Sequence, residues 1–382
     1  MNNQSYQTPT HRRERVLKAV QHQETDFVPY NFHAIPVVYE KLIEHYGLKD
    51  SVELADFIGN HIVKIGSDFN YNPWANEIQE VRLTPSGGPV FTNLDKEGAL
   101  HMDEFGCVWD RTSGMPHPVQ YPLEEDHRLL EKYVMPDPYH AGRFDAARAL
   151  ADQWRDKAFI FGKIGMILFE RAWSLRGMVN MFTDMLDRPE FVDELLDRIL
   201  YEWNLPIIDQ QIALGIDGFY FADDWGSKTG LMFSPKLWRR FIKPRLAIIY
   251  EHCHKAGVYV GQHSDGNIIE IFPDLIEIGL DIFNPLERAV MDPVEMKRRF
   301  GDKVTFYGGI DVERTMPFGT PEEVRAEIRE RAATMGQGGG YILQTTHTVL
   351  WDVPLENLVA YIEEVRALAG LDTPRPNSNA NL

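Results

Sequence analysis

The chain has 382 residues, 44% of them hydrophobic and 25% charged, which is long enough to bury a substantial core. The 57 acidic and 39 basic residues give a formal net charge of −18, and this acidic surface argues against nucleic acid as a partner. With only two cysteines, Cys107 and Cys253, the chain cannot build a disulfide framework or an all-thiolate metal site.

Both ends of the chain lack the periodicity of secondary structure. Residues 1–10 and 371–382 are mostly polar, and we predict that they are disordered tails. Residues 11–370 contain no Gly/Ser linker, low-complexity run or sequence repeat, so we expect them to form one domain. We find no signal peptide and no apolar stretch of 18 residues, which predicts a cytoplasmic protein without a membrane partner.

Short runs rich in β-branched and aromatic residues recur along the chain and are predicted to be strands. There are eight of them, at residues 27–32, 61–69, 159–165, 218–223, 258–263, 281–286, 304–310 and 341–346.

Helical patterns separate most of these strands. Residues 189–203 carry an apolar stripe at helical spacing, and residues 234–257 begin with Ser234 as a helix cap. A further helix is predicted to begin after Thr320. Strands that alternate with helices pair in parallel, and eight such units close into a (β/α)8 barrel. We therefore predict an α/β protein with a single TIM barrel.

The stretch from about residue 70 to 158 is too long for one strand–helix unit. Within it, residues 87–114 read GGPVFTNLDKEGALHMDEFGCVWDRTSG, which alternates short apolar runs with turn residues. We interpret this stretch as an insertion of β-hairpins after the second strand, and we expect it to cover the mouth of the barrel.

Polar and titratable residues occur at most of the predicted strand ends, whereas the strands themselves are apolar. Catalytic groups of TIM barrels sit at the carboxyl ends of the strands, so this pattern predicts a site there. The residues at these ends are Asn31, His33, Ser67, Asp68, Lys163, Asp223, Asp224, Trp225, His263, Asp265, Asn284, Asp311, Thr346 and His347. Among them, the predicted substrate-binding residues are His33, Lys163, Trp225, Asn284 and Asp311.

Asp223 and Asp224 are adjacent, so their side chains point to opposite sides and only one can face the barrel axis. We predict that Asp223 faces inward as a general base and that Asp224 caps a helix or loop. The alternative for the inward acid is a structural salt bridge to Lys228 or Arg171.

The sequence His263-Ser264-Asp265 can be interpreted in two ways. Asp265 followed by Gly266 is an ordinary turn after a strand, in which the carboxylate accepts backbone N–H bonds. Alternatively, His263 and Asp265 are two metal ligands at the mouth of the barrel.

Several segments of the chain resemble the uroporphyrinogen decarboxylase superfamily, which also contains cobalamin-dependent methyltransferases. They include RERVLKAVQHQETDFVP, LFERAWSLRGM, ADDWGSKTGLMFSPKLWRRFIKP and HKAGVYVGQHSDGNIIEIFPDLIEIGLDIFNPLE. Two more, YGGIDVERTMPFGTPEEVRAEI and GGGYILQTTHTVLWDVPLENL, lie near the carboxyl end. The resemblance covers most of the chain outside the insertion and the tails, and it implies the same barrel.

Two branches of the superfamily imply different sites. Decarboxylases resemble this chain at Asp68, Asp223, Trp225 and His347, and in them the residue matching Asp68 gathers the pyrrole N–H groups. Their arginine-rich signature, which binds propionate groups, is replaced here by NFHAIPVVYEKL, which contains no arginine.

The methyltransferase branch carries a His-x-Cys motif after the fifth strand and a second cysteine after the eighth, which together hold zinc. The matching residues here are His263, Asp265 and His347. The resemblance thus implies a divalent metal, zinc first and otherwise iron, cobalt or manganese, with Glu170 available as a fourth ligand. Nitrogen and oxygen ligands favour a metal that polarises an oxygen over one that activates a thiol.

These observations lead to one main prediction and two alternatives. The main one is metal-assisted group transfer, of the corrinoid-linked methyltransferase type, with a small-molecule substrate and a corrinoid protein as partner. The first alternative is a metal-free decarboxylase that acts on a tetrapyrrole or a smaller acid, with Asp68 and His347 as catalytic residues. The second is a barrel that binds a small molecule without catalysis. The resemblance also implies a homodimer.

Overall fold

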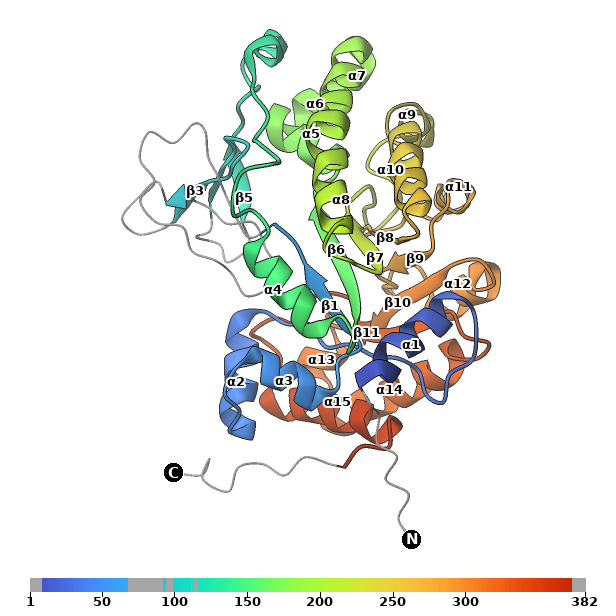
Figure 1. The fold of residues 1–382 in the computed structure, drawn as a ribbon. Coiled ribbons are helices and arrows are strands. Elements are labelled where there is room, and N and C mark those ends of the chain that lie inside the picture. The colour runs from blue at the N-terminus through green and yellow to red at the C-terminus, as the bar shows by residue number, and fades with distance from the viewer. Residues whose placement is uncertain (1–8, 68–91, 94–98, 111, 113–115, 373–382) are drawn as a thin grey trace.

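The computed structural model describes residues 9–67, 92–93, 99–110, 112 and 116–372. Seven strands of this part form one curled parallel sheet, as expected for a TIM-barrel-like α/β fold (Figure 1). In spatial order they are β1 (Ile62–Ile65), β6 (Phe159–Gly165), β7 (Gly218–Ala222), β8 (Tyr259–His263), β9 (Ile282–Asn284), β10 (Thr305–Ile310) and β11 (Tyr341–Thr345).

The predicted strand at residues 27–32 is reduced to a single parallel bridge between Tyr30 and Leu343 of β11. On its other side, the carbonyl of Tyr30 accepts the N–H of His61, just before β1. At Phe32 the Asn60 side chain takes the place of a backbone partner. Its amide oxygen accepts the Phe32 N–H at 3.0 Å, and its amide nitrogen donates to the Phe32 carbonyl at 3.1 Å. This segment therefore connects the two edges of the sheet without forming a regular ladder.

Helices surround the sheet (Figure 1). They are α1 (Pro9–Val20), α2 (Pro36–Tyr46), α3 (Ser51–Ile58), α4 (Asp145–Trp154), α5 (Phe169–Arg176), α6 (Met178–Asp187), α7 (Pro189–Arg198), α8 (Leu205–Ile212), α9 (Pro235–Phe241), α10 (Lys243–Lys255), α11 (Phe272–Glu277), α12 (Pro293–Phe300), α13 (Thr315–Phe318), α14 (Pro321–Met335) and α15 (Leu355–Leu368). A 3-10 turn, η1 (His127–Lys132), precedes α4, and a π-helical stretch, η2 (Ile199–Asn204), joins α7 to α8.

The predicted helix starts are confirmed. The Ser234 hydroxyl accepts the N–H of Leu237 at the start of α9. At the start of α14, Thr320 and Glu323 form a reciprocal capping box, which satisfies two backbone donors that a helix start would leave unpaired.

The inner face of the sheet carries its own apolar cluster at the amino-terminal end of the strands. Phe159, Phe161, Tyr220, Ile282, Tyr307 and Ile342 pack there with Val16, Ala19 and Val20 of α1. The carbonyl of Ala19 accepts the Gly340 N–H and the Thr305 hydroxyl, which fixes the end of α1 to β10 and β11. Helix α1 therefore closes this end of the sheet interior.

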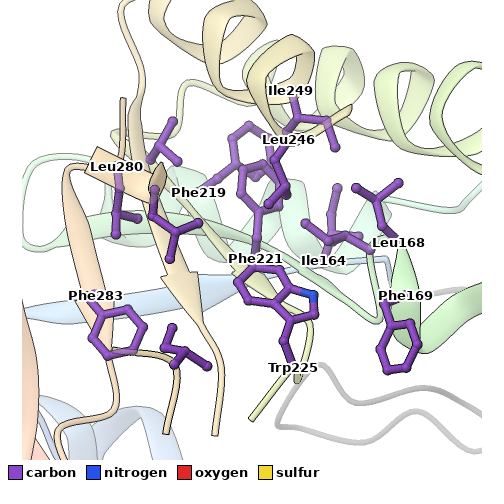
Figure 2. Close-up of a cluster of buried hydrophobic side chains, with 14 of the residues drawn as sticks. Ile164, Leu168, Phe169, Phe219, Phe221, Trp225, Leu246, Ile249, Leu280 and Phe283 are labelled. Atoms are coloured by element: carbon purple, nitrogen blue, oxygen red, sulfur yellow. The ribbon is translucent and has the colours of Figure 1, made fainter. Parts of the chain in front are cut away.

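The outer face of the sheet packs against the surrounding helices. Phe219 and Phe221 of β7 stack with ring centroids 4.9 Å apart, next to Leu246 and Ile249 of α10 (Figure 2). Because residues alternate between faces along a strand, Tyr220 between these two phenylalanines faces inward. This outer core fixes the strands whose carboxyl ends carry the candidate site.

A second sheet lies between β1 and β6 in chain order. It is antiparallel and consists of β2 (Thr92–Asn93), β3 (Leu100–Met102), β4 (Val108–Asp110) and β5 (His117–Gln120). Its β3–β4 turn contacts α5, since Arg171 pairs with Asp103 at 3.2 Å and the Cys107 thiol donates to the Ser174 carbonyl. Asp68, a predicted catalytic residue, lies outside the described residues.

The helices in the described part of the chain include none that is long and apolar enough to cross a membrane.

Candidate metal centre

His263, Asp265 and His347 bring three ligand atoms together at the carboxyl ends of β8 and β11. One nitrogen or oxygen from each residue lies within 4.8 Å of the other two. The Asp265 carboxylate is 3.5 Å from Nε2 of His263 and 3.9 Å from Nε2 of His347, one oxygen facing each imidazole. The sheet brings the three together although more than 80 residues separate His347 from the other two.

The turn after β8 explains why the first two of these ligands face the same side. The intervening Ser264 points the other way, and its hydroxyl accepts the Trp225 N–H at 3.1 Å. Gly266 has a φ of 78°, and a Cβ there would lie 2.5 Å from the Gly226 carbonyl carbon. The glycine thus lets the turn that carries Asp265 lie directly against the loop after β7.

Asn284 fixes the tautomer of His263. The Asn284 amide nitrogen donates to the Tyr307 carbonyl at 2.6 Å, which directs its oxygen toward Nδ1 of His263, also at 2.6 Å. An amide oxygen only accepts hydrogen bonds, so Nδ1 carries the proton and Nε2 keeps its lone pair for a metal. The Tyr220 hydroxyl donates to the same amide oxygen at 2.5 Å. Asn284, predicted to bind substrate, has this orienting role in the structure.

The structure differs from the expectation in which of the two adjacent aspartates lies beside the candidate ligands. Asp224 accepts the Asp265 N–H at 2.8 Å, which agrees with its predicted role as a loop cap, but it also lies 3.9 Å from Nε2 of His263. Burial raises the pKa of Asp224, although His263 opposes that shift. Strand β7 ends at Ala222, so the alternation of a strand no longer decides which of the two acids faces the site.

Asp223 is fully buried at the amino-terminal end of α5 instead. Its carboxylate accepts N–H groups of Phe169 at 2.9 Å and Glu170 at 2.8 Å, and the Trp225 indole N–H at 2.8 Å. By accepting the two backbone N–H groups, the carboxylate satisfies the first turn of α5, so Asp223 acts as a helix cap and does not belong to the three close ligand atoms found among the described residues. Trp225 is also fully buried and packs on Trp238, and its contact with substrate stays a prediction.

Glu170, predicted as a fourth metal ligand, lies beside Asp224. It does not belong to the set of three close ligand atoms found among the described residues. Burial, together with the nearby Asp224 and Asp223, raises the pKa of Glu170 well above its usual range. A buried carboxyl next to another acid tends to keep its proton, which gives the site a potential proton donor.

The remaining predicted residues divide between the interior and the surrounding loops. His33 and Lys163 lie near each other, since burial and then the charges of Lys64 and Lys163 lower the pKa of His33 well below its usual range. The Asp311 carboxylate accepts the N–H groups of Glu313 and Arg314, which gives it a local role in the turn after β10.

Sequence reasoning missed Tyr220 and Lys64. Tyr220 lies in the middle of an apolar strand, where a tyrosine looks like core packing. Lys64 is a single charge in the apolar run HIVKIG, two residues after Ile62, which faces the inner cluster. A lysine at an inward position of a buried strand is the signal that identifies it.

Two imidazoles and one carboxylate are a suitable donor set for zinc, and also for ferrous iron, cobalt or manganese. The fixed tautomer of His263 and the converging ligand atoms fit such an ion. His347 is 47% exposed, and partial desolvation followed by the neighbouring His263 lowers its pKa. A lowered pKa favours the neutral imidazole, which is the form that binds metal.

Comparison with known proteins identifies relatives of the chain. A family model described as uroporphyrinogen decarboxylase (URO-D) matches residues 100–368. The uroporphyrinogen decarboxylase of Psychromonas ingrahamii is 25% identical over 262 residues, which cover 63% of this chain and 68% of that protein. The uroporphyrinogen decarboxylase of Pseudomonas fluorescens is 26% identical over 192 residues, which cover 48% of this chain and 50% of that protein. The chain thus spans between about half and two thirds of these relatives.

Among solved structures, a methyltransferase from Methanosarcina mazei has a TM-score of 0.66 to this chain. The alignment covers 94% of this chain and 98% of that chain, with 18% sequence identity. At this identity the likeness concerns the fold alone.

Proposed function

We propose, on the premise that the chain belongs to the uroporphyrinogen decarboxylase family, that it is an enzyme of metal-assisted group transfer. The transferred group in this proposal is a methyl group, exchanged between a small molecule and a corrinoid carried by a partner protein. The fold likeness to a methyltransferase over nearly the whole chain supports this branch of the family. We also infer that the strands form a closed (β/α)8 barrel and that the insertion, from about residue 70 to 158, covers the mouth of this barrel.

One observation carries this proposal: His263, Asp265 and His347 direct three ligand atoms to one point. These three residues would hold the divalent ion, zinc or another metal that accepts nitrogen and oxygen ligands. A bound ion would supply Lewis acidity that polarises an oxygen of the substrate. A site of hard ligands suits an oxygen-linked methyl group better than a thiol.

The protein residues around these ligands have separate tasks. Asn284 and Tyr220 keep the Nε2 lone pair of His263 directed at the metal position. Glu170 holds a proton on its buried carboxyl, next to Asp224, and can donate it to the oxygen that loses the methyl group. His347 is the most exposed of the ligands, so it lies where a substrate would enter.

Metal analysis tests the proposal. Protein purified without chelator or a nickel column should contain about one divalent ion per chain. His263→Ala and Asp265→Ala should each lose it. His252→Ala should retain it, because that histidine pairs with Asp209 outside the site. The parent protein, but not the two ligand variants, should then demethylate methoxylated small molecules in the presence of reduced cobalamin. A metal-free parent protein that is fully active would contradict the proposal.

Decarboxylation is the second candidate, because the curated relatives named above are uroporphyrinogen decarboxylases. It would depend on Asp68 and His347 and would need no metal. Release of carbon dioxide that survives in Asp265→Ala and disappears in Asp68→Asn would favour this candidate over methyl transfer.

A further inference from the structure

Two lysines face the interior of the sheet beside the candidate metal centre. Lys64 of β1 is in register with Phe161, and Lys163 of β6 is in register with Tyr220. Phe161 and Tyr220 both belong to the inner apolar cluster. Since cross-strand partners lie on the same face, both lysine side chains point into the interior.

Neither ammonium group has an anionic partner in the part of the chain that the structure describes. None of the ion pairs found there includes Lys64 or Lys163, and neither Nζ donates a hydrogen bond to a described residue. The Lys64 Nζ lies over the Tyr220 ring at 3.5 Å and near the Tyr307 ring at 5.2 Å. Aromatic faces attract a cation, but they replace only part of the hydration that burial removes.

This arrangement costs stability. Burial lowers the pKa of both lysines, and the charge of Lys163 lowers the pKa of Lys64 further. Two partly buried cations that lack a counterion among the described residues are under-stabilised, and such a site gains free energy when an anion enters. Lys64 and His33 also line a cavity of about 150 Å³, whose other walls include residues of α3 and α4; Lys163 does not line it, so this cavity is separate from the space between the two lysines.

Tyr220 connects the two lysines to the candidate metal centre. Its ring faces the Lys64 ammonium, while its hydroxyl is 3.0 Å from Nδ1 of His263. Strand register places Lys163 level with Tyr220, and His263 level with Ala222, two residues further along β7. At about 3.3 Å per residue, these two levels are roughly 7 Å apart along the strands.

We propose that Lys64 and Lys163 form an anion subsite that binds a carboxylate, sulfonate or phosphate group of the substrate. The substrate is then a compact acid with its anionic group deep in the interior and its reactive oxygen roughly 7 Å away, at the level of His263. The placement of the reactive oxygen at the level of His263 rests on the proposed function, whereas anion binding by the lysines does not. Two cations on neighbouring strands, next to the site and without an acidic partner in the described part of the chain, carry the inference.

The test measures the thermal unfolding of the protein with and without inorganic phosphate or benzoate, and the binding of each anion by calorimetry. These two compounds probe the phosphate and carboxylate classes of anion. At millimolar concentrations at least one should raise the Tm of the parent protein by a few degrees. Lys64→Met and Lys163→Met should each weaken its binding about 10- to 100-fold, as expected for loss of a charged hydrogen bond. Lys49→Met is the matched control, because that side chain is 86% exposed, and it should bind like the parent.

Two further measurements distinguish an anion subsite from structural lysines and from anion binding at the metal. Without an added anion, Lys64→Met should have a Tm equal to or above that of the parent, because it removes an uncompensated charge and keeps an apolar stem. A lowered Tm would mark a structural lysine. Asp265→Ala should still bind the anion even when it has lost the metal, so failure of the proposed metal chemistry would leave the subsite intact. Binding lost in Asp265→Ala but kept in both lysine variants would place the anion on the metal and overturn the inference.

Discussion

At the scale of single residues, the pair His254–Asp281 shows how one contact makes stability depend on pH. Nε2 of His254 lies 2.8 Å from Asp281, whose carboxylate also accepts the Val260 N–H at 2.7 Å. The hydrogen bond with Asp281 is the main reason that the pKa of His254 is raised, and burial partly opposes it. His254 also lies in the last turn of α10, where a positive charge is favourable.

We predict that His254→Gln lowers stability in acid but not in base. The folded-state pKa is raised above the unfolded value of about 6.5, so the contribution is fully present below that value and disappears as pH rises through the folded pKa. The side chain is 38% exposed, so solvent screening limits the effect to about 0.5 kcal/mol. Urea unfolding of both proteins at pH 5.5 and pH 8.5 measures it. A difference that is larger at pH 8.5 would contradict the assignment.

Single residues also show where sequence reasoning succeeds and where it fails. His263 and Asp265 follow a clear strand at a spacing of two residues, so the sequence alone suggests them as a pair of metal ligands. Their meeting with His347 depends on sheet order, which the resemblance implied. Which of Asp223 and Asp224 lies beside the ligands could not be predicted, because the strand ends one residue earlier and loop contacts decide it.

At the scale of elements, the junction between β11 and β1 combines a short stretch of backbone pairing with the contacts of one side chain. Residues 27–32 have the composition of a strand, yet one bridge is all that they form. Composition predicts that a segment is extended, but it does not reveal that Asn60 takes the place of a neighbouring strand. The regular strands and the capped helices were predictable because their signals are local.

We expect Asn60→Ala to destabilise the protein by about 3 kcal/mol. The substitution leaves the buried N–H and carbonyl of Phe32 without partners, and unsatisfied buried groups cost more than a net hydrogen bond contributes. Asn180→Ala is the control, because its amide donates to carbonyls nearer the surface and should cost less than about 1 kcal/mol. Equal losses in the two variants, measured by urea unfolding, would show that Asn60 does not have this special role.

At the scale of the whole molecule, the two faces of the sheet have separate cores. Helices pack on the outer face, whereas the inner face is filled at one end by its own aromatic side chains and by α1. Polar and charged groups occupy the other end. The sequence predicted this polarity from the strand ends, but it did not reveal that the first helix belongs to the inner core.

We predict that Val16→Ala destabilises the protein by about 2 kcal/mol, because Val16 is fully buried against the inner cluster. Val179→Ala, at a position that is 79% exposed, should change stability by less than about 0.5 kcal/mol. Thermal unfolding of the two variants compares them directly. If Val16→Ala were as stable as the parent, α1 would not be part of the inner core.

If the proposed function holds, the closure of one end by α1 constrains the order in which the reactants bind. Side chains fill the amino-terminal end of the sheet interior, so the candidate site is reached from the opposite end. Under the proposed function, the small molecule and the corrinoid use this same entrance. The small-molecule substrate then has to bind before the corrinoid protein covers the entrance, and its product cannot leave until the corrinoid protein has dissociated. This binding order produces compulsory-order kinetics, in which excess corrinoid protein slows turnover because it binds at the entrance before the small molecule.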